Sequence, residues 1–326
     1  MTIVNVLQVL LVTFPFFALV LCGYLAASRR MLPLEAIPGL NSFVLFFALP
    51  CMLYRFGAIT PLAQLLDAGV LLTWAFCALV TVAFTIAISK GAGIGWNDAS
   101  FGALVAAFPN TGFMGVPLLV ALLGAQAAGP IILTMLVDMV LTTSLCIALS
   151  RLDLADEHGA RQAAVKALKG VAGNPLPWSI LLGALSSVVQ LELPKPMLQT
   201  VTLLADAASP VALFTIGAVL ARSQIMTAAS GHAPIPLRDY LSVAAIKLLL
   251  HPLLVLLVGS AALGLGLPLD KFALTVIVLA AALPSASNVS LLAERFDADN
   301  GRITRIILLS TAAAFISFSA AVALLT

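Results

Sequence analysis

Long apolar runs are the feature of this sequence that most limits what it can fold into. A helix rising about 1.5 Å per residue needs about 20 residues to cross the roughly 30 Å hydrocarbon layer of a bilayer. Only 9% of the residues are charged, too few to give this 62% hydrophobic chain a water-facing surface. We therefore predict an all-α membrane protein with ten transmembrane helices, near residues 3–27, 38–56, 69–89, 99–123, 131–150, 175–191, 197–220, 240–264, 271–293 and 303–325.

The distribution of Lys and Arg predicts the orientation of these helices. Twelve of the sixteen basic residues fall in one set of alternate loops, three fall in the opposite set, and Lys247 lies inside a predicted helix. Basic residues gather in the cytoplasmic loops of membrane proteins. We therefore expect both termini on the outer face, as in a protein of the bacterial inner membrane.

The longest hydrophilic stretch divides the chain into two parts with five predicted helices each. It covers residues 151–174, predicted to be a cytoplasmic linker, and separates a first repeat at 1–150 from a second at 175–326. An odd number of helices per part forces related parts into opposite orientations. Such inverted repeats are typical of secondary transporters.

Two of the predicted helices carry proline and polar residues near their midpoints. The fourth contains Pro109-Asn110-Thr111-Gly112, and the ninth contains Pro284 followed by Ser285, Ser287 and Asn288. A proline removes a backbone donor and costs about 3 kcal/mol in a helix interior. Both prolines lie roughly 15–20 Å from the start of their helices. The sequence therefore predicts two broken helices that cross at mid-membrane.

Broken backbone at that depth must be buried in protein or line a cavity. The N-termini of the second half-helices would present free N–H groups and partial positive charge, which favour an anion. Asn110, Ser285, Ser287 and Asn288 could cap those ends or bind a carboxylate. The other interpretation is a pair of proline kinks satisfied by neighbouring helices.

The residues around these breaks resemble the auxin efflux carrier family, in particular its prokaryotic members, some of which are associated with malonate transport. The resemblance is clearest over Phe108–Pro117, which reads Phe-Pro-Asn-Thr-Gly-Phe-Met-Gly-Val-Pro. It extends to the Phe43–Pro50 run, to Asn174-Pro175, and to Lys247 with Pro252. The ninth helix departs from the plant pattern, because it reads Pro284-Ser-Ala-Ser-Asn288.

The resemblance implies a fold shared with bile-acid symporters and sodium–proton antiporters, in which helices 4 and 9 break and cross. Helices 1, 2, 6 and 7 would form a scaffold. Helices 3–5 and 8–10 would form a transport domain that moves like an elevator. The family's crossover asparagine corresponds to Asn110. The substrate-binding residues implied by both arguments are Pro109, Asn110, Thr111, Gly112, Pro284, Ser285, Ser287 and Asn288.

Charged groups inside the predicted membrane helices are a second set of candidates. Asp138 lies in the fifth helix, and Lys247 and His251 lie one turn apart in the eighth. Intramembrane charge is expensive and marks ion pathways or buried pairs. One interpretation is a group that responds to H⁺ or Na⁺ beside the crossover. Another is a structural Asp138–Lys247 ion pair, with His251 as a packed histidine.

These patterns favour a secondary transporter of a small organic carboxylate anion. The alternatives within transport are a sodium-coupled symporter and a cation antiporter. Outside transport, a membrane receptor is an alternative, whereas an enzyme would need a catalytic cluster that the sequence lacks. We expect no cofactor, no metal site and no nucleic-acid partner. The candidate partners are the carboxylate, H⁺ or Na⁺, the lipid bilayer and a second copy of the chain in a homodimer.

Overall fold

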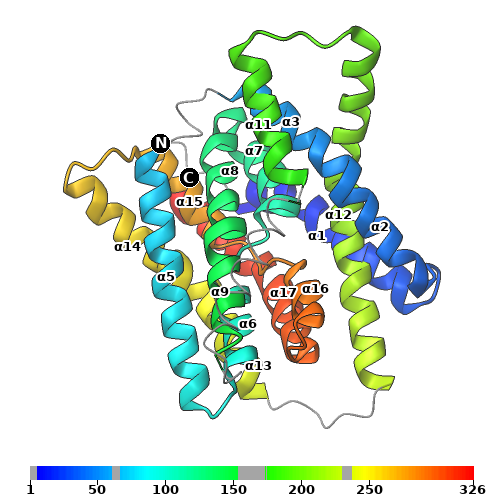
Figure 1. Ribbon diagram of the computed structural model, residues 1–326, viewed down its shortest axis with the longest axis vertical. Helices are drawn as coiled ribbons and strands as arrows, with labels where there is room; N and C mark the ends of the chain where they lie inside the picture. Colours follow the sequence, from blue (N-terminus) through cyan, green and yellow to red (C-terminus); the bar gives the residue numbers. More distant parts are fainter. Residues whose placement is uncertain (1–5, 61–66, 153–172, 174, 230–236) are drawn as a thin grey trace.

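The computed structural model describes residues 6–60, 67–152, 173, 175–229 and 237–326, and all the regular elements in these ranges are helices (Figure 1). Most of the predicted linker at 151–174 lies outside them. Seven helical stretches are long and apolar enough to cross a membrane: Leu11–Ser28, Leu34–Ile59, Ala68–Gly91, Ala125–Leu149, Lys195–Met226, Leu237–Gly264 and Asn300–Leu325. Three apolar helices are shorter: Thr111–Leu123, Pro175–Val188 and Lys271–Ala281. The prediction of an all-helical, membrane-compatible fold is confirmed.

Each predicted transmembrane stretch coincides with one or more of these helices. The three shorter ones belong to the predicted fourth, sixth and ninth stretches, and the fourth and ninth are each interrupted. The elements are α1 (Val6–Ser28), η1 (Leu34–Ala36), α2 (Ile37–Phe43), η2 (Val44–Ala48), α3 (Leu49–Ile59), α5 (Ala68–Gly91), α6 (Trp96–Ala107), η3 (Thr111–Gly115), α7 (Val116–Leu123), η4 (Ala125–Ala127), α8 (Ala128–Val137), η5 (Asp138–Thr142), α9 (Thr143–Leu149), α11 (Pro175–Val188), α12 (Lys195–Ala229), α13 (Leu237–Ala245), η6 (Ile246–Leu250), α14 (His251–Gly264), α15 (Lys271–Ala281), α16 (Val289–Arg295) and α17 (Asn300–Leu325).

Helix α5 illustrates why these helices suit a bilayer. Leu72, Phe76 and Leu79 point outward and are exposed, while Trp74 and Cys77 on the other face are fully buried. Such an apolar outer surface would promote aggregation in water. Lipid tails, in contrast, are as apolar as these side chains. The surface of α5 therefore suits lipid.

Four wide helical turns follow from local chemistry. The segments η2, η3, η5 and η6 are π-helical turns, a form that is rare elsewhere and frequent at functional sites. Proline has no N–H and its ring clashes with the carbonyl four residues earlier, so the preceding turn must widen. Three of the four turns precede such a proline, namely Pro50, Pro117 and Pro252. In η5 the Thr143 hydroxyl instead donates to the carbonyl oxygen of Asp138 at 2.8 Å.

The helices pack into two groups. In the first, α1 packs along α12 and α3 packs along both α11 and α12. In the second, α5 contacts α6, α8 and α14, while α17 contacts α13 and α16. Figure 1 shows α2, α3, α11 and α12 on one side of the molecule and α5, α6, α13 and α14 on the other.

Glycines allow the backbones of the first group to touch. A side chain at Gly23 of α1 or at Gly217 of α12 would collide with the backbone of the other helix. The same is true of Gly57 in α3 and Gly183 in α11. Small residues of this kind let membrane helices approach closely without a hydrophobic driving force. These two backbone contacts hold the first group together.

Helices α1 and α17 run antiparallel and bring the two described ends of the chain together. The hydroxyls of Thr13 and Ser319 lie 3.4 Å apart, and the rings of Phe17 and Phe315 meet edge-on at 5.2 Å. Moving four residues forward in α1 therefore corresponds to moving four residues back in α17. The N and C labels accordingly lie close together in Figure 1.

We expect Gly217→Val to separate α1 from α12, because the new side chain has no space beside the backbone at Val20. Overpacking of this kind costs at least about 1–3 kcal/mol. Thermal unfolding in detergent, followed by circular dichroism, should show a lower midpoint. Gly264→Ala is the matched control, since a side chain there meets nothing within 4 Å. Equal midpoints for the two variants would contradict the close packing.

Candidate functional site

Two interrupted helices cross at the centre of the second group. Helix α6 ends at Ala107 and η3 begins at Thr111, while α15 ends at Ala281 and α16 begins at Val289. The intervening segments run antiparallel and are joined by two reciprocal backbone hydrogen bonds. The Asn110 N–H donates to the Pro284 carbonyl at 2.8 Å, and the Ala286 N–H donates to the Phe108 carbonyl at 3.0 Å. The predicted breaks therefore pair with each other.

Ser285 replaces the hydrogen bond that Pro109 cannot make. In a continuous helix the Val105 carbonyl would accept from residue 109, but proline has no N–H. The Ser285 hydroxyl donates to this carbonyl instead, at 2.7 Å. The N–H of Ser285 in turn donates to the Ser310 hydroxyl of α17 at 3.2 Å. Backbone groups at this depth must be satisfied by protein, so Ser285 is part of the framework of the crossing.

Lys247 satisfies the carbonyl at the end of α15. In an uninterrupted helix the Ala281 carbonyl would accept from the N–H of Ser285, which here bonds to Ser310. Lys247 reaches across from η6 and donates from Nζ to the Ala281 carbonyl at 2.9 Å. Cations are favourable at the C-terminal end of a helix, where the partial charge is negative. The second broken helix is thus held from both sides of its gap.

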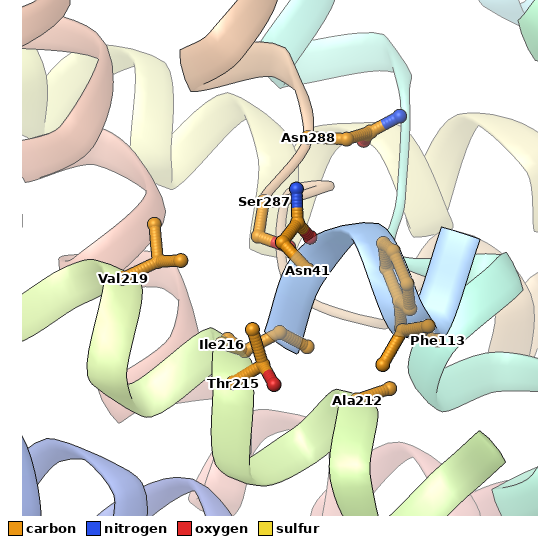
Figure 2. Close-up of a pocket in the computed structure, with 9 residues that line it drawn as sticks. Asn41, Phe113, Ala212, Thr215, Ile216, Val219, Ser287 and Asn288 are labelled. Carbon is orange, nitrogen blue, oxygen red and sulfur yellow. The ribbon is translucent and has the colours of Figure 1, made fainter. Parts of the chain in front are cut away.

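A pocket lies beside the crossing, between the two helix groups (Figure 2). Its cavity volume in this conformation is about 10 Å³, which is room for about one water molecule. Figure 2 shows Ala212, Thr215, Ile216 and Val219 along one side of α12, with Ser287 and Asn288 above them. The lining is completed by Asn41 and Val44 of the first group and Phe113 of η3. All nine residues are uncharged.

The predicted substrate-binding residues divide between the pocket and its framework. Ser287 and Asn288 line the pocket. Asn110, Pro109, Pro284 and Ser285 build the crossing, where Pro109 and Ser285 form an isolated antiparallel bridge. Thr111 is fully buried, and Gly112 faces the Met135 sulfur of α8.

The helix starts carry fewer caps than expected. Neither Asn110 nor Asn288 makes a side-chain cap to the helix that follows it, so the capping alternative does not hold for these two residues, and carboxylate binding stays a prediction. Both backbones are already fixed by the crossing and its turns. Their side-chain amides are consequently not committed to these helix ends.

Asn41 and Thr215 are pocket residues that the sequence treatment missed. Both are uncharged polar residues within long apolar stretches. A polar residue in an apolar stretch is the same kind of signal that identified Asp138 and Lys247, but it is weaker without a charge. Their place in the pocket depends on how α2 and α12 face the crossing, which hydropathy does not encode. The residue type of Asn41 could therefore have made it a candidate, but its position in the pocket could not have been predicted from the sequence.

The predicted charged candidates lie together behind the crossing. Lys247 Nζ lies 3.1 Å from His251 Nδ1, which confirms that the two share a helix face. Asp138 is close enough to Lys247 for an electrostatic interaction but forms no direct ion pair with it. The interpretation as a structural Asp138–Lys247 ion pair is therefore wrong. His251 has a partner at Nδ1 but none at Nε2, so its ring is only half satisfied.

Together, the apolar helices, the paired helix breaks and the neutral pocket between two helix groups define a polytopic membrane transporter. The sequence matches the family described as "Membrane transport protein" over residues 8–322, nearly the whole chain. The protein belongs to this family, which is that of the auxin efflux carriers. It is an integral membrane protein that transports a small molecule, and not an enzyme.

Individual relatives agree with this assignment. The chain is 32% identical to the "Putative malonate transporter" of Rhizobium meliloti (strain 1021) over 304 residues, covering 91% of this chain and 89% of the relative. It is 27% identical to the "Uncharacterized transporter YfdV" of Escherichia coli (strain K12) over 288 residues, covering 87% of each. Both relatives are similar along nearly their full lengths, so the resemblance includes both broken helices.

We expect Ser285→Ala to destabilise the protein, because it leaves the buried Val105 carbonyl without its donor. An unsatisfied buried acceptor costs about 1–3 kcal/mol. Thermal unfolding of the purified protein in detergent should detect the loss. Ser242→Ala is the matched control, since this exposed hydroxyl also donates to a helical carbonyl, that of Arg238 at 3.1 Å. Equal stability of the two variants would remove Ser285 from the framework.

Proposed function

We propose that this protein carries a small, malonate-like carboxylate across the membrane by elevator-type alternating access. The observation that carries the proposal is the position of the pocket. Asn41, Thr215 and their neighbours belong to one helix group, whereas Phe113, Ser287 and Asn288 belong to the other. A substrate held there contacts both groups. Movement of one group against the other would then open the site to alternate sides.

The chemistry of the lining suits an anion that has an apolar part. Asn41 and Asn288 offer amide N–H donors, and Thr215 and Ser287 offer hydroxyls. The helix that begins at Thr111 leaves its first N–H groups without intrahelical partners, at an end that favours negative charge. No carboxylate lines the pocket. Phe113 and Ile216 supply apolar surface, as most small-molecule sites do.

The paired glycine contacts support the inverted-repeat arrangement. If the chain consists of two related five-helix parts, helix 1 corresponds to helix 6 and helix 2 to helix 7. The contact of helix 1 with helix 7, at Gly23 and Gly217, then has its counterpart in the contact of helix 6 with helix 2, at Gly183 and Gly57. The two reciprocal backbone hydrogen bonds at the crossing, between helices 4 and 9, follow the same exchange of corresponding helices. In the proposed mechanism helices 1, 2, 6 and 7 are the scaffold.

The common location of the two described ends supports an even number of membrane crossings. With ten crossings and the bias of basic residues to one set of loops, we infer that both termini lie on the outer face, in the inner membrane of a bacterium. The alternative of a cation antiporter or sodium-coupled symporter would require acidic ligands beside the break. In the described ranges, no group of three or more His, Cys, Asp or Glu side chains is placed to hold a metal ion.

Uptake of labelled malonate by proteoliposomes tests the proposal, and two changes at Asn288 test the charge of the substrate. We expect Asn288→Ala to weaken binding by about 10–100-fold, because a hydrogen bond to a charged group is worth about 1.5–3 kcal/mol. Asn288→Asp should weaken it further, since it has the same shape but repels an anion. Asn110→Ala tests the crossover asparagine in the same assay, and we expect it to abolish binding.

Gln199→Ala is the matched control, because it removes an exposed amide of α12 outside the pocket. It should bind and transport like the unchanged protein. A variant at Asn288 or Asn110 that keeps its unfolding midpoint and full affinity would remove that residue from the site. Tighter binding by Asn288→Asp would indicate a cationic substrate and so contradict the proposal.

A further inference from the structure

A buried polar cluster behind the crossing is not explained by carboxylate binding alone. It consists of Trp74 of α5, Asp138 at the start of η5, Lys247 of η6 and His251 of α14. All four side chains have no exposed surface. Two of them lie in π-helical turns, which are frequent at functional sites. A charged carboxylate and an amine buried at this depth are costly and call for a function.

Three polar atoms of the cluster lack a hydrogen-bond partner. They are Asp138 Oδ2, Trp74 Nε1 and His251 Nε2, although the Trp74 indole N–H lies close enough to Asp138 to interact with its carboxylate. The other carboxylate oxygen, Oδ1, accepts from the Thr142 hydroxyl at 3.0 Å. Most buried polar groups in proteins are well paired, so these three atoms in one cluster call for an explanation.

Lys247 connects this cluster to the crossing. Its Nζ contacts His251 Nδ1 at 3.1 Å and donates to the Ala281 carbonyl at 2.9 Å. Ala281 is the last residue of α15, and the segment after it leads directly to Ser287 and Asn288 in the pocket. A change in the charge around Lys247 would therefore act on the end of the helix that leads to two of the nine pocket residues.

The remaining titratable groups around the cluster are few. Cys146 of α9 is fully buried and lies within electrostatic range of Asp138. Cys77 is buried one turn from Trp74 on α5. With Asp138 ionised and Lys247 protonated, the cluster has no net charge. The pocket lining is also uncharged, so a bound carboxylate would leave the moving group with a net negative charge in the membrane.

We propose that Asp138 binds the proton that is carried together with the carboxylate. An O–H bond forms at Oδ2 when the site faces one side of the membrane, and the proton returns to water on the other side. Protonation gives the cluster one positive charge, which offsets one of the two negative charges that malonate carries at neutral pH. This inference rests on the proposed function, and it specifies the coupling ion of that same carrier.

The geometry favours a proton over Na⁺. A sodium ion requires several oxygen ligands, as hard cations do. The cluster offers one unpaired carboxylate oxygen, facing an indole N–H that can only donate. A protonated Lys247 can only donate to His251 Nδ1, and the hydrogen of the neutral ring then lies on Nε2 as a further donor. When Lys247 is protonated, its ammonium supplies the positive charge that a bound sodium ion would otherwise provide.

Proton uptake on binding tests the proposal with purified protein and malonate in weakly buffered solution containing a pH indicator. We expect the unchanged protein to take up about one proton per bound malonate, so that binding strengthens as the pH falls. Asp138→Asn should bind malonate without this uptake. Asp206→Asn is the matched control, because it removes an exposed carboxylate that pairs with Arg55 at 2.6 Å. It should behave like the unchanged protein.

Transport by the unchanged protein decides the identity of the ion even if Asp138→Asn does not fold. An inward proton gradient should accumulate labelled malonate, by a factor on the order of ten per pH unit for one proton. A sodium gradient should have no effect. Folded Asp138→Asn should still exchange internal for external malonate but should not accumulate it.

Two outcomes separate the hypotheses. Malonate binding without proton uptake, or accumulation driven by sodium, would overturn the proton site and leave the carrier function intact. A complete absence of malonate binding and exchange in the unchanged protein would overturn the proposed substrate, and the proton site with it.

Discussion

The two backbone hydrogen bonds between Asn110 and Pro284 and between Ala286 and Phe108 are the interaction on which the rest of the structure depends. Water cannot satisfy backbone groups in the hydrocarbon layer, so a helix broken at mid-membrane needs partners from the protein. Each broken helix finds those partners in the other. Neither break is therefore stable alone, and in the proposed mechanism the two broken helices would move together.

How far the sequence predicts this arrangement depends on how local each signal is. Apolar length and the missing N–H of proline are local properties, so the helices and the positions of both breaks could be predicted. The donor that replaces Pro109 could not, because Ser285 lies 180 residues from Val105 along the chain. Pocket residues such as Asn41 were missed for the same reason, since their role arises from helix packing. The ion pair proposed between Asp138 and Lys247 was wrong because an available backbone carbonyl, that of Ala281, is the better-placed partner for the lysine.

In the proposed carrier, a neutral pocket that binds an anion is a physical problem with a limited set of solutions. Amide and hydroxyl donors can orient a carboxylate, but they do not remove its charge from a medium of low polarity. A lysine in the pocket would neutralise the anion. It would, however, hold the substrate about equally tightly in every conformation, including those that must release it. A compensating charge behind the crossing, next to the end of α15, leaves the pocket itself free of fixed charge. The position of Lys247 between the cluster and the Ala281 carbonyl suits that solution.

The distribution of contacts also limits which parts can move in the proposed mechanism. Within the first group, the helices meet backbone to backbone at Gly23 and Gly217, a contact that tolerates no sliding. Within the second group, the crossing is held by backbone hydrogen bonds. Between the groups, the hydrogen bonds that the structure describes join side chains, such as Ser223 to Thr304 at 2.8 Å and Thr13 to Ser319 at 3.4 Å. Side-chain contacts can exchange partners without disturbing a helix, whereas buried backbone bonds cannot break without exposing unpaired groups to lipid. Movement along the boundary that contains the pocket is therefore the least costly rearrangement of this fold.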